Sequence, residues 1–212
     1  MSKSLAKLIS SVYKSKIGKS LIGLSAGAMI FSGTFCLGNK VYGEETKDIV
    51  AYWSFNVDAS ESNGNKSLDG TFVGNAHIEN NKYAPVLGNT GCLVLDGELS
   101  RVNLPAPLAP IIGQLKEGSI EAWGYLNQPK HAMIFNSGVA ALFTDINVEI
   151  ENPLEQKIHM GIENTNHWFL LKDFEFNKWH HYAWSWDASK VQFWIDYNLI
   201  ETKGLTKILT LT

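Results

Sequence analysis

Residues 178–199, KWHHYAWSWDASKVQFWIDYNL, decide the fold. In the first half large residues alternate, so that Trp179 falls on one face of an extended chain and Tyr182 on the other. Alternation of aromatic and β-branched residues with a period of two is typical of β-strands. The polar segment 187–190 supplies turn chemistry between the two halves. The stretch therefore predicts a β-hairpin, and the apolar groups on both faces place it inside a two-layer sandwich.

Strand signals recur along the rest of the chain, whereas helix signals are poor. Short segments with apolar and aromatic residues are bounded by Gly, Asn, Asp and Pro, which favours an antiparallel all-β fold. The predicted strands are residues 49–55, 70–74, 91–95, 101–104, 119–126, 132–136, 140–143, 157–162, 168–172, 179–186 and 191–196. The sequence has no internal repeat, and its length after the N-terminal segment suits one domain.

Four segments, in their order along the chain, carry a resemblance to a known family. They are IVAYWSFN at 49–56, LVLDG at 93–97, GSIEAWGY at 118–125 and WHHYA at 179–183. Together they resemble the laminin-G-like domains of the concanavalin A-like jelly-roll superfamily, over residues 48–199. The resemblance implies a two-sheet antiparallel jelly-roll sandwich. It also implies that Trp53, Trp123 and Trp179 lie in the core.

The chain departs from the family pattern at its C-terminal end. Tyr197 and Asn198 stand where the family usually has glycine in a V-D-G-like turn. Asn198 tolerates positive φ, so we still expect a turn there. Family members continue to a strand that resembles I-D-E-V-R-I-Y, and no such segment follows here. We therefore expect a jelly roll that lacks C-terminal strands, with the strand candidate 207–211 as an alternative substitute.

Residues 1–43 have the layout of a secretory signal peptide. Residues 1–19 hold five lysines and no acidic residue, residues 21–37 are apolar but diluted by Gly and Ser, and residues 41–43 loosely fit a small-residue cleavage rule. The alternative is an uncleaved membrane anchor, for which the apolar run is short. We expect cleavage, a protein that is secreted or displayed at the cell surface, and a single domain at 44–212.

Removal of this segment makes the chain strongly acidic. Of 18 basic residues 12 remain, against all 21 acidic ones, so the net charge becomes −9. Such a charge argues against nucleic acid or anionic lipid as a partner, and it is compatible with carbohydrate, calcium or a basic protein. Cys92 is the one cysteine left in the mature chain, so no disulfide can form within it. We expect Cys92 to be a small buried core residue.

The polar loop 58–69, DASESNGNKSLD, is a candidate calcium site. Calcium takes six to eight oxygen ligands, which this loop supplies in number, although the EF-hand spacing is not met. A solvated hairpin loop is the alternative. The resemblance favours calcium as a cofactor, since many laminin-G-like domains bind it through loop carboxylates and carbonyls. The candidate ligands are Asp58, Asp69 and Asp96.

Catalysis is the competing function, because the same superfamily fold houses glycoside hydrolases. These enzymes use two carboxylates about 5–9 Å apart. In one family of them the acidic residues follow the pattern E-x-D-x-E on a single strand. The nearest match here, VEIENP at 148–153, lacks the middle acid. Glu121 has no acidic residue two positions away on either side. We expect Glu121 to be a structural or surface residue and the protein not to be an enzyme.

The adjacent histidines at 180 and 181 could suggest a metal site. Successive side chains of a strand point to opposite faces, so His180 and His181 cannot both bind one ion without distortion. We expect both rings to be hydrogen-bonded within the sheet.

Trp168 is the candidate ligand-facing aromatic residue, together with Asn166 in the polar run before it. An indole ring offers a flat apolar face on which the C–H groups of a sugar can stack. We expect a non-catalytic domain that recognises a glycan or an extracellular protein, with membrane contact only if residues 1–43 stay attached. The alternatives are a diverged glycoside hydrolase or its accessory domain, and a purely structural cell-surface module.

Overall fold

The structure is a computed structural model in which strands dominate. It describes residues 21–23, 32–36, 49–62, 64–86, 88–106, 117–127, 132–135, 146–152, 155–162, 165–171 and 174–205. Within these ranges the helical structure is limited to a 3-10 turn at Lys66–Leu68, and no helix has the length and apolar character needed to cross a bilayer. The fold is therefore all-β, and the prediction of an antiparallel β-sandwich is confirmed.

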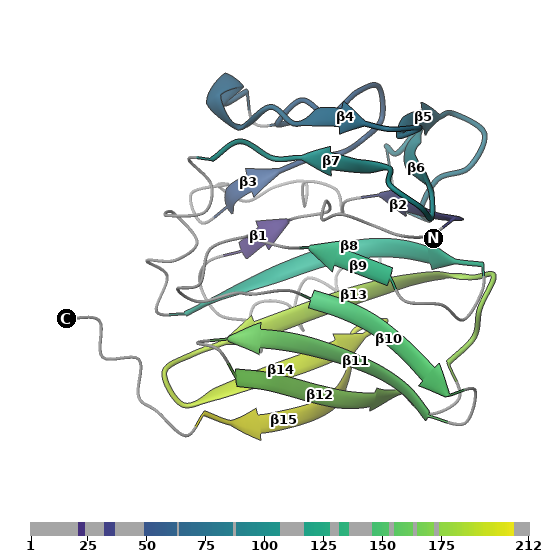
Figure 1. The fold of residues 1–212 in the computed structure, drawn as a ribbon. Coiled ribbons are helices and arrows are strands. Elements are labelled where there is room, and N and C mark those ends of the chain that lie inside the picture. The colour runs from purple at the N-terminus through teal and green to yellow at the C-terminus, as the bar shows by residue number, and fades with distance from the viewer. Residues whose placement is uncertain are drawn as a thin grey trace, which may run out of the picture.

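The largest sheet, sheet A, has the strand order β15-β14-β13-β8-β2-β6-β5, and β1 joins β3 to it (Figure 1). Its strands are β1 (Leu21–Gly23), β2 (Ser32–Cys36), β3 (Ile49–Tyr52), β5 (His77–Glu79), β6 (Cys92–Asp96), β8 (Gly118–Leu126), β13 (Trp179–Trp186), β14 (Lys190–Ile195) and β15 (Asn198–Gly204). Neighbouring strands on this path are antiparallel. Strand β1 is the exception, because it runs parallel to both β3 and β8.

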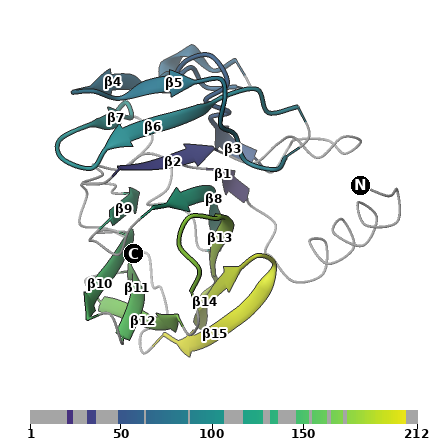
Figure 2. The ribbon, with the colours of Figure 1, turned by 90° about the vertical axis from the view of Figure 1, so that its right-hand side faces the viewer.

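Two further sheets cover one face of sheet A. Sheet B has the order β12-β11-β10-β9, and β4 pairs with β7. Their strands are β4 (Thr71–Val73), β7 (Arg101–Asn103), β9 (Ala132–Phe135), β10 (Ile146–Asn152), β11 (Glu155–Ile162) and β12 (Thr165–Leu171). Figure 2 shows β10–β12 as a separate layer beside β14 and β15. The second layer of the sandwich is thus divided between sheet B and the β4–β7 pair.

The main core lies between these layers. Phe169 of β12 and Val102 of β7 pack in one apolar cluster with Ile120, Tyr182 and Phe193 of sheet A, and all five are buried. Burial of a large aromatic or aliphatic side chain contributes about 1.5–3 kcal/mol to folding. Because alternate residues of a strand point to opposite faces, this cluster defines the inner face of sheet A. The residues that alternate with these core residues along each strand define the outer face of sheet A.

The central hairpin has the register that its alternation predicts. Strand β13 has the predicted bounds, and it lies between β8 and β14 with Tyr182 opposite both Ala122 and Ile195. Its turn is fixed by Asp187, whose Oδ1 accepts the backbone N–H groups of Ser189 and Lys190. The polar segment in the sequence is therefore a turn closed by an aspartate side chain.

The next turn corrects one expectation. Asp196 and Tyr197 form a two-residue connection between β14 and β15, with φ of 48° and 66°. Positive φ at both central residues is the signature of type I′ hairpins. Asn198, where we expected the tolerance for positive φ to be used, is instead the first residue of β15 and donates its side-chain amide to the Asp196 carbonyl oxygen. The turn thus lies one residue earlier than predicted.

The strand predictions agree with the structure within a few residues wherever the described ranges allow a comparison. Strands β1, β2, β5, β10 and β15 were not predicted. The predicted strand at 140–143 and the strand candidate at 207–211 lie outside the described residues. Cys92 is buried and free, as expected.

Residues of the expected signal peptide lie inside sheet A. Strand β2 sits between β8 and β6, and β1 connects β8 with β3 (Figure 1). Cleavage after Gly43 would remove both strands, and it stays a prediction.

A buried carboxylate fixes the opening strand to the loop at 58–69. Glu61 is only 3% exposed, and its two oxygens accept the backbone N–H groups of Tyr52 at 3.0 Å and Asn65 at 2.9 Å. The backbone N–H of Glu61 in turn donates to Asp69 at 2.8 Å. A buried carboxylate needs such hydrogen-bond donors, so this loop is held by its own acidic side chains.

We expect Glu61→Ala to lower the free energy of unfolding by about 1–3 kcal/mol, since two partly buried hydrogen bonds to backbone N–H groups lose their acceptor. Urea denaturation would measure the change. The control Glu61→Gln keeps one acceptor oxygen and should lose less than half as much. Equal stability of wild type and Glu61→Ala would contradict the anchoring role.

Candidate functional site

Polar and aromatic side chains share the outer face of sheet A along β8 and β13. The register places Tyr125 opposite Trp179, Trp123 opposite His181, and Glu121 opposite Ala183. These residues alternate with the inner-face core, so they belong to the side of the sheet that points away from sheet B. The outer face thus carries two neighbouring features, an aromatic pocket and a buried carboxylate–histidine pair.

The aromatic pocket lies at the Trp179 end of this row. Its volume is about 320 Å³, and it is lined by Asn81, Lys82, Tyr83, Tyr125 and Trp179. The rings of Tyr125 and Trp179 meet edge to face with centroids 5.7 Å apart, and Tyr83 is 50% exposed. The pocket therefore combines two packed rings of the sheet with one accessible ring and two polar side chains from the loop after β5.

A small apolar cluster holds that loop against the sheet. Ala84 and Cys92 are fully buried and pack with Val86, Trp123 and Trp179. The Cys92 thiol also donates to the carbonyl oxygen of Lys82, next to the pocket. Trp179 thus packs partly against this cluster, and these contacts fix the position of the loop.

The carboxylate–histidine pair lies further along the same face. Glu121 Oε2 is 3.2 Å from His181 Nε2, and both side chains are more than nine-tenths buried. The other two polar atoms, Glu121 Oε1 and His181 Nδ1, have no hydrogen-bond partner among the described residues. A buried polar pair with unsatisfied atoms lowers stability, and such groups are often retained for function.

Two aromatic rings frame this pair. Tyr197 stacks on His181 with a centroid distance of 4.7 Å and an angle of 18°. Trp123 lies 5.3 Å from His181 and 6.5 Å from Tyr197. Burial, together with the negative charges of Glu121 and Asp196, raises the pKa of Tyr197 to about 12. The phenol therefore stays protonated at neutral pH and can donate a hydrogen bond.

The side chain of the neighbouring histidine, His180, lies on the opposite face of the sheet, as predicted. Its Nδ1 lies 2.8 Å from Asp196 Oδ2 and its Nε2 lies 2.9 Å from the Glu175 carbonyl oxygen. Both ring nitrogens thus face acceptors, which only the doubly protonated imidazolium can satisfy. Burial lowers the pKa of His180, but the hydrogen bonds to Asp196 and Glu175 outweigh burial and leave the pKa raised.

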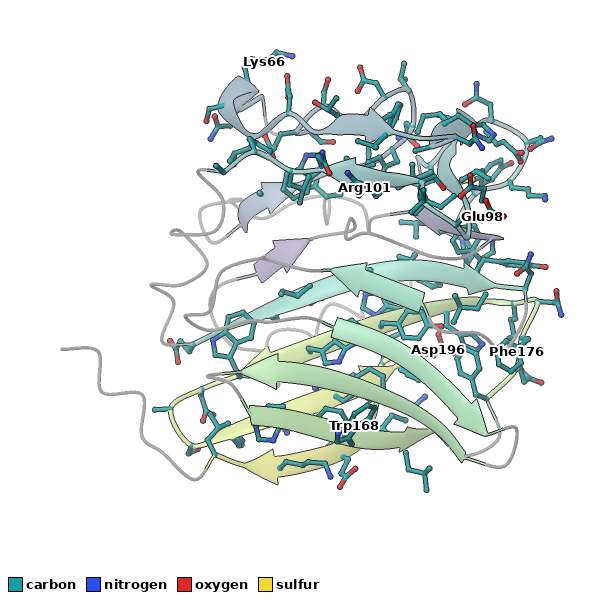
Figure 3. All side chains as sticks on the ribbon, viewed as in Figure 1. Lys66, Glu98, Arg101, Trp168, Phe176 and Asp196 are labelled. Atoms are coloured by element: carbon teal, nitrogen blue, oxygen red, sulfur yellow. The ribbon has the colours of Figure 1, made fainter. Side chains whose placement is uncertain are left out.

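The predicted ligand-facing tryptophan lies on another surface. Trp168 is 36% exposed and Leu170 is 42% exposed, on the face of β12 opposite the core residue Phe169 (Figure 3). The aromatic pocket is on the far side of sheet A, so the structure does not bring Trp168 to it. Asn166 is in β12, opposite Gly161 of β11, and its side chain lies outside the described residues. Ligand binding at Trp168 and Asn166 stays a prediction.

The predicted calcium ligands are used for the fold. Asp58 accepts the backbone N–H of Ser60, and Asp69 accepts that of Glu61. Asp96 accepts from Asn75 and Ser100, and these hydrogen bonds, led by that of Ser100, lower its pKa to about 2. In the described part of the chain no three His, Cys, Asp or Glu residues are grouped closely enough to hold a metal ion. Asp58, Asp69 and Asp96 thus form no such group in the described residues, and calcium binding through these carboxylates stays a prediction.

The pocket residues were not predicted as a site. The resemblance assigned Trp123 and Trp179 to the core, whereas the structure leaves both partly buried on the outer face, with Trp179 in the pocket. Alternation along 118–125 and 179–186 does place Tyr125 on the same face as Trp179. Asn81 and Tyr83 carried no such signal, because their position depends on the pairing of β5 with β6.

Comparisons with known proteins identify no family. No family model matches the chain, and no curated protein matches it. Among solved structures, domain 4 of AbnA, a GH43 extracellular arabinanase from Geobacillus stearothermophilus, in complex with arabinotriose, is similar with a TM-score of 0.45 and 16% sequence identity. The match covers 88% of this chain and 80% of that one. At this similarity it assigns neither a family nor a ligand to the chain.

The His180–Asp196 pair predicts a pH dependence of stability. Asp196 has a lowered pKa: burial raises it, but the hydrogen bonds from His180 and from the His181 N–H lower it by more. The charged Asp196 therefore stabilises the folded protein fully above pH 3.8, the usual pKa of an aspartate. This stabilisation is lost as pH falls through the lowered pKa of Asp196. The protonated His180 stabilises the folded protein fully below pH 6.5, the usual pKa of a histidine. This stabilisation is lost as pH rises through the raised pKa of His180.

We expect Asp196→Asn to destabilise the protein most between about pH 4 and pH 6.5, and the difference from wild type to shrink above that window. Thermal melting from pH 3 to pH 9 measures it. His167, whose pKa is lowered by burial and by Lys203, titrates in both proteins and cancels in the difference. A difference that is constant with pH would contradict the ion pair.

Proposed function

We propose that this chain is a secreted, non-catalytic domain that recognises a glycan through the aromatic pocket on the outer face of sheet A. The observation that carries the proposal is the combination of Tyr83, Tyr125 and Trp179 with Asn81 and Lys82 around one cavity. Small-ligand sites typically join apolar and aromatic walls with a few polar groups that fix orientation. That the domain is laminin-G-like, as the sequence resemblance implies, is likewise a part of this proposal.

The chemistry of the pocket suits a sugar. The accessible Tyr83 ring offers a flat face to pyranose or furanose C–H groups, and the phenol groups and the Asn81 amide can bond hydroxyls. None of the ion pairs in the described part of the structure involves Lys82. Its ammonium group is therefore available as a donor to hydroxyl or carboxylate oxygens.

Recognition of an extracellular protein is the second candidate. The observation that favours it is the pair of exposed apolar residues on β12, Trp168 and Leu170, because exposed apolar side chains that adjoin one another often mark interaction sites. The two functions use different surfaces, so single substitutions can separate them.

We expect Tyr83→Ala to weaken glycan binding about tenfold, the loss of about 1.4 kcal/mol that an interface aromatic residue often contributes. A glycan array with neutral and acidic oligosaccharides would identify a ligand, and calorimetry would measure its affinity. Tyr83 is half exposed, so the substitution should leave stability nearly unchanged.

Trp168→Ala is the matched control, because it removes an exposed aromatic ring from the other surface. It should bind the glycan as wild type does. Loss of binding in Trp168→Ala with retention in Tyr83→Ala would move the site to β12. Binding of no glycan at all would leave the protein-recognition candidate.

We expect no hydrolysis of the bound glycan, since hydrolysis requires two suitably placed carboxylates and Glu121 is paired with His181. Release of reducing ends from a polysaccharide panel measures this directly. Turnover that is lost in Glu121→Gln, but kept in the exposed-residue control Glu98→Gln, would show instead that the buried pair belongs to an active site.

A further inference from the structure

The aromatic pocket presents hydrogen-bond donors that the fold leaves unused. All of its lining side chains carry a polar group: the Asn81 amide, the Lys82 ammonium, the Tyr83 and Tyr125 hydroxyls and the Trp179 indole N–H. None of these groups has a hydrogen-bond partner within the part of the chain that the structure describes. They are therefore available to a ligand.

Donors outnumber acceptors in this set. An ammonium group has three N–H donors and no acceptor, and an indole N–H is a donor only, whereas amide and hydroxyl groups can serve as both. A carboxylate is the complement of such a set, because it is charged and only accepts hydrogen bonds. A sulfate ester has the same two properties. The donor set therefore favours an anionic ligand over a neutral one.

The positive charge of Lys82 has no carboxylate partner among the described residues. None of the ion pairs formed by these residues involves Lys82, and the described residues that line the pocket include no acid. The acidic residues within four positions of a lining residue are paired elsewhere: Glu79 with His77, Glu121 with His181, and Glu175 with Lys178. The described lining thus carries one positive charge that a ligand can neutralise.

The fold fixes the backbone at Lys82 and leaves its side chain exposed. The buried Cys92 thiol donates to the Lys82 carbonyl oxygen, so the contact that holds the loop does not involve the ammonium group. The side chain itself is exposed, and its charge therefore faces the pocket without the cost of burial in the free protein. Substitution of this side chain should leave the loop in place.

The chain as a whole does not attract anions. Its net charge is −3, and a protein that is acidic overall has no general attraction for a polyanion. Recognition of an acidic ligand must therefore come from the local contact at Lys82. This distinguishes the pocket from the broad basic surfaces that bind polyanions without selectivity.

We propose that the aromatic pocket selects acidic sugars, whose carboxylate or sulfate group pairs with Lys82 while the sugar ring stacks on Tyr83. The inference rests on the proposed function, glycan recognition by this pocket, and specifies the class of glycan. The pocket volume of about 320 Å³ is at the lower end of the range for ligand sites. It therefore holds a short part of an oligosaccharide chain.

The test measures how the full chain binds matched pairs of oligosaccharides that differ only in the acidic group. The pairs are oligogalacturonate and its methyl ester, oligoglucuronate and its methyl ester, and a sulfated galactan oligosaccharide and its desulfated form. Calorimetry at neutral pH should show about tenfold tighter binding of the charged member in at least one pair, the gain expected from a hydrogen bond between charged groups. The preference should weaken at high salt. The pairs that show it distinguish carboxylate from sulfate.

Lys82→Met keeps the apolar stem of the side chain and removes its charge. It should bind the charged oligosaccharide about tenfold less tightly than wild type does, and bind the neutral member equally well. Lys82→Arg should retain the preference. The control Lys66→Met removes a lysine of the 3-10 turn, which pairs with Asp69, and it should bind both members as wild type does.

Three results would overturn the inference. Equal or tighter binding of the neutral members would contradict selection of acidic sugars and leave the proposed glycan recognition in place. A preference for charged members that Lys82→Met retains would place the anion at another site. Failure of all the oligosaccharides to bind would contradict both the inference and the proposed function.

Discussion

The pairing of β8 with β13 is the constraint on which the rest of the structure depends. Its register runs without interruption from Trp179 opposite Tyr125 to Trp186 opposite Gly118. Because side chains alternate along a strand, this one register decides which residues enter the core and which form the outer face. A shift by one residue would exchange Tyr182 and Trp184 for His181 and Ser185 in the core. The division between core and outer face, which places Tyr125 and Trp179 together in the pocket, is therefore a consequence of these backbone hydrogen bonds.

The two adjacent histidines show how this alternation separates stability from candidate function. His180 joins β13 to the turn after β14 through Asp196, and Asp196 also accepts the N–H of His181. His181 itself turns its ring to the outer face, where Glu121 and Tyr197 surround it. Positive φ at Tyr197 strains the backbone of a non-glycine residue by about 1 kcal/mol or more. Stacking on His181 offsets part of that strain, so the turn and the outer-face cluster support each other.

The sequence predicts most of the fold, because period-two alternation is a local property. It gives the bounds of β13 and the approximate positions of β6, β8 and β14, and it separates His180 from His181. It does not predict β15, whose exposed residues Leu199 and Ile200 interrupt a simple alternation. The pocket escaped prediction for a different reason. Tyr83 approaches Trp179 only because β5 pairs with β6 and the Cys92 thiol bonds the Lys82 carbonyl, and neither contact leaves a local pattern.

The segment at 21–37 shows how one composition can suit two physical environments. Export signals need a modest apolar run without charges, and an internal strand needs an uncharged segment that fits between two others. The Gly and Ser residues that make the run a poor membrane span also allow close backbone approach in a sheet. In the structure, β2 supplies such a segment and completes the ladder between β6 and β8.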